Sequence, residues 1–278
     1  MNSYSDRRNH PVRRTRRLFA IAAAGVATIY AAIAGWVYWQ QESLIFHPTP
    51  LSADYRFAVP DVTEVRIPVD GATLSALHFK QTNPKGVVFF LHGNAGNLDS
   101  WVTSVDFYRR VNYDLFIIDF RGFGKSTGRI ESEAQLHHDV QQAWEFIAPQ
   151  YAGKKLVVVG RSLGTGLATA FSIAAKPDLT VLVSPYLSLN AMAQARYPWL
   201  PSVLNRYPMR SDEWLPKINT PVLILHGSID GVIPLAQGEA LARTRPRTEL
   251  IVVPDAGHND IHKFPLYLNS LSARLMAL

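Results

Sequence analysis

The segment Val157–Gly166, VVVGRSLGTG, decides how the rest of the chain is interpreted. It starts with three valines, which favour a β-strand because branched side chains pack well on a pleated surface. Gly160 and Gly164 then flank Ser162 in the pattern Gly-x-Ser-x-Gly. In that pattern the serine stands on a sharp turn from strand to helix, with its hydroxyl at the edge of a sheet. The segment therefore predicts a strand, a tight turn and a helix, with Ser162 as a candidate nucleophile.

Further apolar runs extend this pattern to a whole domain, because such runs are typical of strands buried on both faces of a parallel sheet. The predicted strands are Val65–Val69, Ala72–Phe79, Val87–Leu91, Leu115–Ile118, Leu156–Val159, Val181–Val183, Val222–Leu225 and Leu250–Val253. The predicted helices are about Asp99–Val111, Glu131–Ile147, Ser162–Ala175, Leu235–Arg243 and Asn259–Leu278. Their alternation predicts the α/β class with a mostly parallel, doubly wound sheet.

Two more strand ends supply partners for the serine. A serine hydroxyl needs a base to become a good nucleophile, and the base needs an orienting acid. Asp230 follows the run Val222–Leu225, and His258 follows Leu250–Val253. Ligands bind beyond the carboxyl ends of parallel strands, so we expect Ser162, Asp230 and His258 to converge there as a catalytic triad.

The loop after Val87–Leu91 reads His92-Gly93-Asn94-Ala95-Gly96-Asn97 and is here called the oxyanion loop. Acyl transfer needs backbone N–H groups that point at the developing negative charge. We expect one from Leu163 and the other from Asn94, with Ala95 as the alternative.

Several of these stretches resemble motifs of the α/β-hydrolase superfamily. They are HGNAGN (92–97), FRGFGKS (120–126), GRSLG (160–164), HGSIDGVIP (226–234) and GHND (257–260). The resemblance covers about residues 40–278. It is greatest to the small membrane-anchored serine hydrolases that include palmitoyl-protein thioesterase-like members. It implies the α/β-hydrolase fold and the same triad, in the chain order Ser, Asp, His. The chain departs from the pattern at Phe120 and Phe123, where relatives often have tyrosine, and at Gly231, where an acidic residue is common.

Other polar residues compete for the same roles. His262 is a rival base, and Asp119, which ends a strand, is a rival acid. His92 is interpreted as a structural residue that bonds backbone. The adjacent His137 and His138 point to different faces of a helix, so they are interpreted as solvated residues and not as metal ligands.

The net charge of +6 is concentrated at the N-terminus, where residues 1–17 contain six arginines and one acidic residue. The rest of the chain is almost neutral, which argues against a nucleic-acid-binding surface. The chain has no cysteine, so a thiol nucleophile, a disulfide framework and a cysteine-ligated zinc are excluded.

An apolar run follows this basic tail. Residues 18–39 contain no charged side chain, and as a helix they would rise about 33 Å, enough to cross a membrane. Arginines at one end and Trp36, Tyr38 and Trp39 at the other predict a cytoplasmic N-terminus and a body outside the cytoplasm. A cleaved signal peptide is the main alternative, since Arg16-Arg17 resembles a twin-arginine signal and Ala32-Ile33-Ala34 a cleavage site. A buried core helix is a third possibility.

These patterns divide the chain into a basic tail (1–17), a transmembrane anchor (18–39), a linker (40–60) and an α/β-hydrolase domain (61–278). The connection 186–219 is too long for a simple crossover, and we interpret it as a cap. Its aromatic residues Tyr186, Tyr197 and Trp199 are predicted to bind substrate; the alternative is a decorated surface loop.

The predicted function is hydrolysis of a carboxylic ester or thioester, on hydrophobic acyl substrates, with no cofactor and no metal. One alternative is an aminoacyl or oligopeptide hydrolase, for which Asp212 and Glu213 near the cap are candidate amine-binding groups. The other is a non-catalytic, membrane-anchored binding scaffold.

Overall fold

The computed structural model describes residues 10–102 and 105–278, in two compact units. The first, up to Gln41, consists mainly of helix α1, His10–Trp39. Within it Arg14–Trp39 has a mean hydropathy of 2.0 and is long and apolar enough to cross a membrane. The helix begins earlier than the predicted 18–39, because arginine is a good helix former and hydropathy does not mark helix ends. Residues 1–9 of the predicted tail lie outside the described residues.

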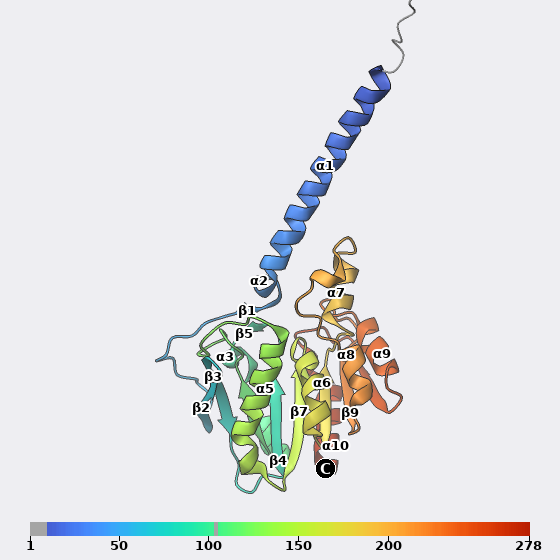
Figure 1. Ribbon diagram of the computed structural model, residues 1–278. Coiled ribbons are helices and arrows are strands. Elements are labelled where there is room, and N and C mark those ends of the chain that lie inside the picture. The colour runs from blue at the N-terminus through green and yellow to red at the C-terminus, as the bar shows by residue number, and fades with distance from the viewer. Residues whose placement is uncertain (1–9, 103–104) are drawn as a thin grey trace, which may run out of the picture. The chain divides into compact units, whose positions relative to one another are not determined.

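The second unit, Glu42–Leu278, contains an eight-stranded sheet in the order β10-β9-β8-β7-β4-β6-β3-β2 (Figure 1). Its strands are β2 Val62–Val69, β3 Ala72–Phe79, β4 Gly86–Leu91, β6 Tyr113–Ile118, β7 Lys155–Arg161, β8 Leu179–Val183, β9 Val222–Gly227 and β10 Thr248–Val253. All the predicted strands are present, most of them longer by one to three residues at one or both ends. The strands β6, β4, β7, β8, β9 and β10 are parallel to one another. Strand β3 runs antiparallel to both of its neighbours, β2 and β6.

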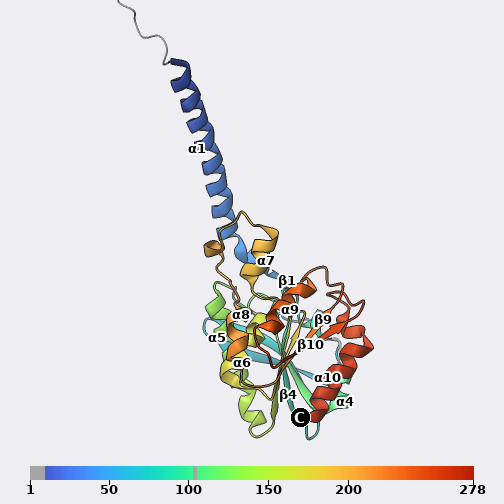
Figure 2. The same ribbon diagram turned by 90° about the vertical axis from the view of Figure 1, so that its right-hand side faces the viewer.

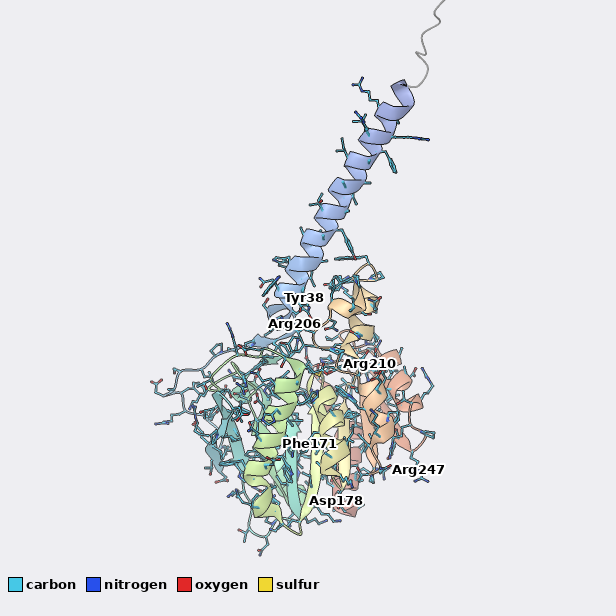
Figure 3. All side chains as sticks on the ribbon, viewed as in Figure 1. Tyr38, Phe171, Asp178, Arg206, Arg210 and Arg247 are labelled. Atoms are coloured by element: carbon cyan, nitrogen blue, oxygen red, sulfur yellow. The ribbon has the colours of Figure 1, made fainter. Side chains whose placement is uncertain are left out.

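Helices cover both faces of this sheet (Figure 2). They are α3 Leu98–Trp101, α4 Val105–Val111, α5 Glu133–Ile147, α6 Gly164–Ala175, α9 Leu235–Arg243 and α10 Pro265–Ala277. On one face, Phe171 of α6 packs against Phe89 of β4 and Trp144 of α5 (Figure 3). On the other face, α4 and α10 bury a separate apolar cluster that includes Leu271. This two-sided burial explains why the parallel strands are apolar throughout.

Four of the five predicted helices have different bounds. The predicted helix Glu131–Ile147 begins at Glu133, because Ser132 caps its N-terminus, and the predicted helix Ser162–Ala175 begins at Gly164. Capping also explains the bounds of the other two. The predicted helix Asp99–Val111 is two helices: a capping box between Asn97 and Ser100 starts α3, and the non-helical backbone of Val102 ends it. The predicted helix Asn259–Leu278 begins only at Pro265, a residue suited to the first helical turn because it lacks an N–H group.

The predicted linker 40–60 is partly incorporated into the domain. Helix α2 spans Gln41–Ile45, and strand β1, His47–Pro48, pairs with strand β5, Ala95–Gly96, of the oxyanion loop. Phe46, which lies between α2 and β1 in the chain, is only 5% exposed and packs edge-on against Tyr207. Burial of this aromatic ring fixes part of the predicted linker to the domain.

The predicted cap is the connection between β8 and β9. It contains α7 Leu189–Arg196, α8 Ser211–Trp214 and two short 3₁₀ helices at Ser202–Leu204 and Leu215–Lys217. No residue of α7 is fully buried, but Leu189 and Met192 are partly buried and pack against the core.

His78 of β3 makes the stability of the domain depend on pH. Its Nε2 lies 2.6 Å from the Tyr151 hydroxyl, which itself donates to Asp114. Burial, helped by the charge of Lys80, lowers the pKa of His78 from 6.5 to about 4. Between these pH values the unfolded chain takes up a proton that the folded chain does not, so stability falls as the pH is lowered.

We expect His78 to account for a loss of about 3 kcal/mol of unfolding free energy between pH 6.5 and pH 4. The His78→Gln variant cannot titrate in this range, so its unfolding free energy should depend less on pH by that amount. Urea unfolding of both proteins at a series of pH values measures the difference. Parallel pH profiles for the two proteins would show that His78 has no such role.

Candidate active site

Ser162 lies on a strained turn between β7 and α6. Its backbone φ is 52°, in the left-handed region that side chains other than glycine rarely adopt. The helix begins at Gly164 and not at the predicted Ser162. The flanking glycines allow close packing: a Cβ on Gly164 would lie 2.1 Å from the Leu91 carbonyl oxygen, and one on Gly160 would lie 2.5 Å from the Gly164 carbonyl oxygen.

We therefore expect Gly164→Ala to lower the free energy of unfolding by about 1–3 kcal/mol or more, because the new methyl group meets the backbone of β4. Gly231→Ala is the matched control: a Cβ there meets nothing within 4 Å, and the change should stay within about 0.5 kcal/mol. Chemical unfolding measures both. Equal stability of the two variants would contradict the close packing at this turn.

His258 and Asp230 lie in line with Ser162. His258 Nε2 is 3.0 Å from Ser162 Oγ, and His258 Nδ1 is 2.8 Å from Asp230 Oδ2. Asp230 can only accept at that bond, so Nδ1 has the ring proton and Nε2 is free to accept from the serine. The arrangement can remove a proton from Ser162 and hold the resulting imidazolium.

The carboxylate of Asp230 is kept ionised by its hydrogen bonds. Its side chain is fully buried, and burial alone would raise its pKa. Hydrogen bonds from His258 and from the backbone amides of Ile233 and Val232 outweigh burial, so the pKa lies below the usual value. The two amides bind Oδ1 at 2.8 and 2.9 Å, which leaves Oδ2 for the histidine.

The two predicted oxyanion donors both lie in backbone next to Ser162. Leu163 follows the serine directly, and a Cβ on Gly93, next to Asn94, would lie 3.4 Å from Ser162 Cβ. Within residues 10–102 and 105–278, the backbone amides of Leu163 and Asn94 have no hydrogen-bond acceptor. They are therefore available to an incoming oxygen atom.

The rival residues contact other partners. His262 Nδ1 is 3.4 Å from an Arg161 nitrogen. Asp119 is fully buried, with Oδ1 3.3 Å from Nε2 of His92. The other ring nitrogen of His92 lies 2.7 Å from the Gly93 carbonyl oxygen, so His92 bonds backbone as predicted. Its ring also packs against Phe120 and Phe123, which are both buried.

His137 and His138 of α5 diverge as predicted. His137 lies 3.6 Å from Glu133 on its own helix, and His138 lies 3.2 Å from Asp70. His138 is exposed, as predicted for a solvated residue, but His137 is not: its Nε2 is buried and its ring packs edge-on against Trp214.

Arg161 has a role that the sequence does not predict. Its guanidinium donates to the His258 carbonyl oxygen at 3.1 Å and stacks over the Trp101 ring at 5.2 Å. Arg161 thereby holds the backbone of the loop that positions His258. The only signal in the sequence was its place next to Ser162, which says nothing about the direction of the side chain.

The substrate-binding role predicted for Tyr186 of the cap is wrong. Tyr186 is 1% exposed, and its hydroxyl donates to the Leu163 carbonyl oxygen at 3.0 Å. It fills the space left by Gly166, where a Cβ would lie 2.3 Å from that hydroxyl, so it supports the turn and cannot line a pocket. Tyr197 and Trp199 are 47% and 49% exposed and pack edge-on with ring centroids 6.2 Å apart; their role in binding remains a prediction.

Comparison with known families and proteins agrees with this geometry. The family model described as serine aminopeptidase, S33, matches residues 82–213, and the model described as alpha/beta hydrolase fold matches residues 209–265. An uncharacterized protein of Mycobacterium tuberculosis is 30% identical over 90% of both chains. The alpha/beta hydrolase domain-containing protein aho-3 of Caenorhabditis elegans is 31% identical over 68% of this chain, which spans 57% of that protein's length.

Among solved structures, an esterase of Pyrococcus furiosus has the same fold. The TM-score is 0.65 and the identity is 20%, over 84% of this chain and 97% of the esterase. The sheet order, the turn at Ser162 and these matches lead to one conclusion: the chain belongs to the α/β-hydrolase superfamily.

Proposed function

We propose that the protein is a serine hydrolase that cleaves carboxylic esters, or thioesters, through Ser162, His258 and Asp230. The observation that supports this most strongly is the pair of hydrogen-bond distances, 3.0 Å from Ser162 to His258 and 2.8 Å from His258 to Asp230. These distances fall in the range that general-base catalysis requires.

In the proposed reaction Ser162 Oγ attacks the acyl carbonyl carbon while its proton passes to His258 Nε2. Asp230 stabilises the imidazolium that forms, and the amides of Leu163 and Asn94 bind the oxyanion. His258 then gives its proton to the leaving alcohol or thiol. A water molecule, deprotonated by His258, attacks the acyl-enzyme, and the His258 proton returns to Ser162 Oγ as the acid is released.

The proposal of a hydrophobic acyl substrate rests on the apolar helix and on the cap. A helix that can anchor the chain would keep the domain close to lipids, where esters with long acyl chains concentrate. Tyr197 and Trp199 provide exposed aromatic surface on the cap. We further propose that the helix is an uncleaved anchor, with the domain outside the cytoplasm. Processing to a shorter chain in the cell would favour the signal-peptide alternative instead.

Peptide hydrolysis is the second candidate, because one matching family model is described as a serine aminopeptidase. A free amino terminus would need an unpaired carboxylate near the site. Asp212 and Glu213 were the candidates, but both lie 2.8 Å from the guanidinium of Arg210; Figure 3 labels Arg210 on the ribbon. Arg210 already binds both carboxylates, so neither is unpaired, and ester hydrolysis is the better-supported function.

Hydrolysis of p-nitrophenyl esters from acetate to palmitate, beside aminoacyl p-nitroanilides, tests this choice. We expect ester turnover by the full chain in detergent, with an optimum at medium or long acyl chains. Faster cleavage of an aminoacyl anilide than of every ester would support the peptidase and contradict the esterase.

A further inference from the structure

The segment Ile45–Thr49, which follows helix α1 after a few residues, is bonded to the oxyanion loop along its length. The His47 amide donates to the Asn94 carbonyl oxygen at 2.7 Å, and the Thr49 amide donates to that of Gly96 at 2.9 Å. These bonds form the parallel pair of β1 and β5, which lie side by side near one end of the large sheet (Figure 1).

Side chains of the loop add two bonds to the same segment. Asn94 Nδ2 donates to the Ile45 carbonyl oxygen at 3.0 Å, and Asn97 Nδ2 donates to that of Thr49 at 2.9 Å. Asn94 is thus held through both its carbonyl and its side chain, while its own amide stays without an acceptor among the described residues. Trp101 Nε1 also bonds the loop, donating to the Ala95 carbonyl oxygen at 2.7 Å.

The segment is itself fixed on its other sides. Phe46 is buried against Tyr207. Beyond Thr49, the Leu51 amide donates to the Gly124 carbonyl oxygen at 2.8 Å, and the Gly124 amide donates back to Thr49 at 3.3 Å. Because these contacts fix Ile45–Thr49, the segment can itself fix the position of the oxyanion loop.

We propose that Ile45–Thr49 is a positioning segment of the active site, which fixes the oxyanion loop so that the Asn94 amide faces Ser162. An oxyanion donor is effective only when it is oriented before the charge forms, and misplacement by about 1 Å can cost about 10²-fold in rate. The inference rests on the proposed hydrolase function. Under this proposal, the segment that follows the apolar helix also orders an oxyanion donor, the Asn94 amide.

His47→Pro in the full chain tests the segment, because it removes one N–H donor to the loop. We expect kcat for the best p-nitrophenyl ester to fall about 10- to 100-fold with little change in KM, since a lost oxyanion contact acts in the transition state. His47→Ala is the matched control: the side chain is exposed and the N–H remains, so kcat should stay at the wild-type value.

Asn94→Ala is the second variant, and it decides the matter if His47→Pro does not fold. It keeps the Asn94 amide but loses the bond to Ile45, so it should also lower kcat more than it changes KM. Wild-type kcat in Asn94→Ala and in a folded His47→Pro would overturn the positioning role, with the hydrolase function intact. A wild-type protein that turns over no ester would overturn the hydrolase function itself.

Discussion

Ser162→Ala should lower kcat for ester hydrolysis by about 10⁶-fold, the largest effect expected of any single substitution in this chain. The variant removes the atom that attacks the substrate and leaves His258 and the oxyanion donors in place. Because alanine keeps the Cβ, the fold and the free energy of unfolding should change little. Steady-state kinetics with the best p-nitrophenyl ester measures the loss.

Ser184→Ala is the control for this variant. Ser184 also follows a strand of the sheet, β8, is fully buried and has a φ of 51°. In the described part of the chain its hydroxyl has no hydrogen-bond partner. Ester turnover should be unchanged in this variant. If Ser162→Ala retained wild-type turnover, the nucleophile would have to be another residue.

Asp230→Asn should lower kcat by about 10⁴-fold while the fold is retained. An amide can donate to His258 Nδ1 and so stabilise the wrong tautomer, in which Nε2 has the proton and cannot accept one from Ser162. It also cannot compensate the imidazolium charge. Kinetics at several pH values should show the loss throughout the neutral range, because the low pKa of Asp230 keeps it ionised there in the wild type.

Asp255→Asn is the control for the acidic residue. Asp255 lies in the loop before His258 and is exposed, and among the hydrogen bonds of the described residues none joins its side chain to Ser162, Asp230 or His258. We expect wild-type kinetics. A similar loss in both variants would indicate that general loop disturbance, and not the tautomer of His258, controls the rate.

The fold and the three central residues could be predicted from the sequence because each follows its own apolar strand. Parallel strands bring their carboxyl ends to one edge of the sheet. Prediction of the three strands was therefore enough to place Ser162, Asp230 and His258 together. The helix ends were less predictable, since caps and prolines determine them. The start of α6 at Gly164, beyond the strained Ser162, is an example.

The supporting residues could not be predicted because their roles depend on side-chain direction and long-range contacts. Tyr186 is an aromatic residue in a long connection, which suggested a pocket lining, but the missing side chain of Gly166 gives its ring a buried place. Arg161 reaches a carbonyl far along the chain. The segment Ile45–Thr49 has no strand-like pattern, and its two-residue strand forms only because the oxyanion loop lies beside it.

Labelling with a fluorophosphonate, followed by mass spectrometry of the digested protein, tests the central claim most directly. The reagent bonds covalently to a serine activated by a neighbouring base, whatever the natural substrate is. We expect one adduct, on the peptide that contains Ser162, and its loss in a His258→Ala variant. Absence of any adduct in the folded wild type, or an adduct on another serine, would show that Ser162 is not the activated nucleophile.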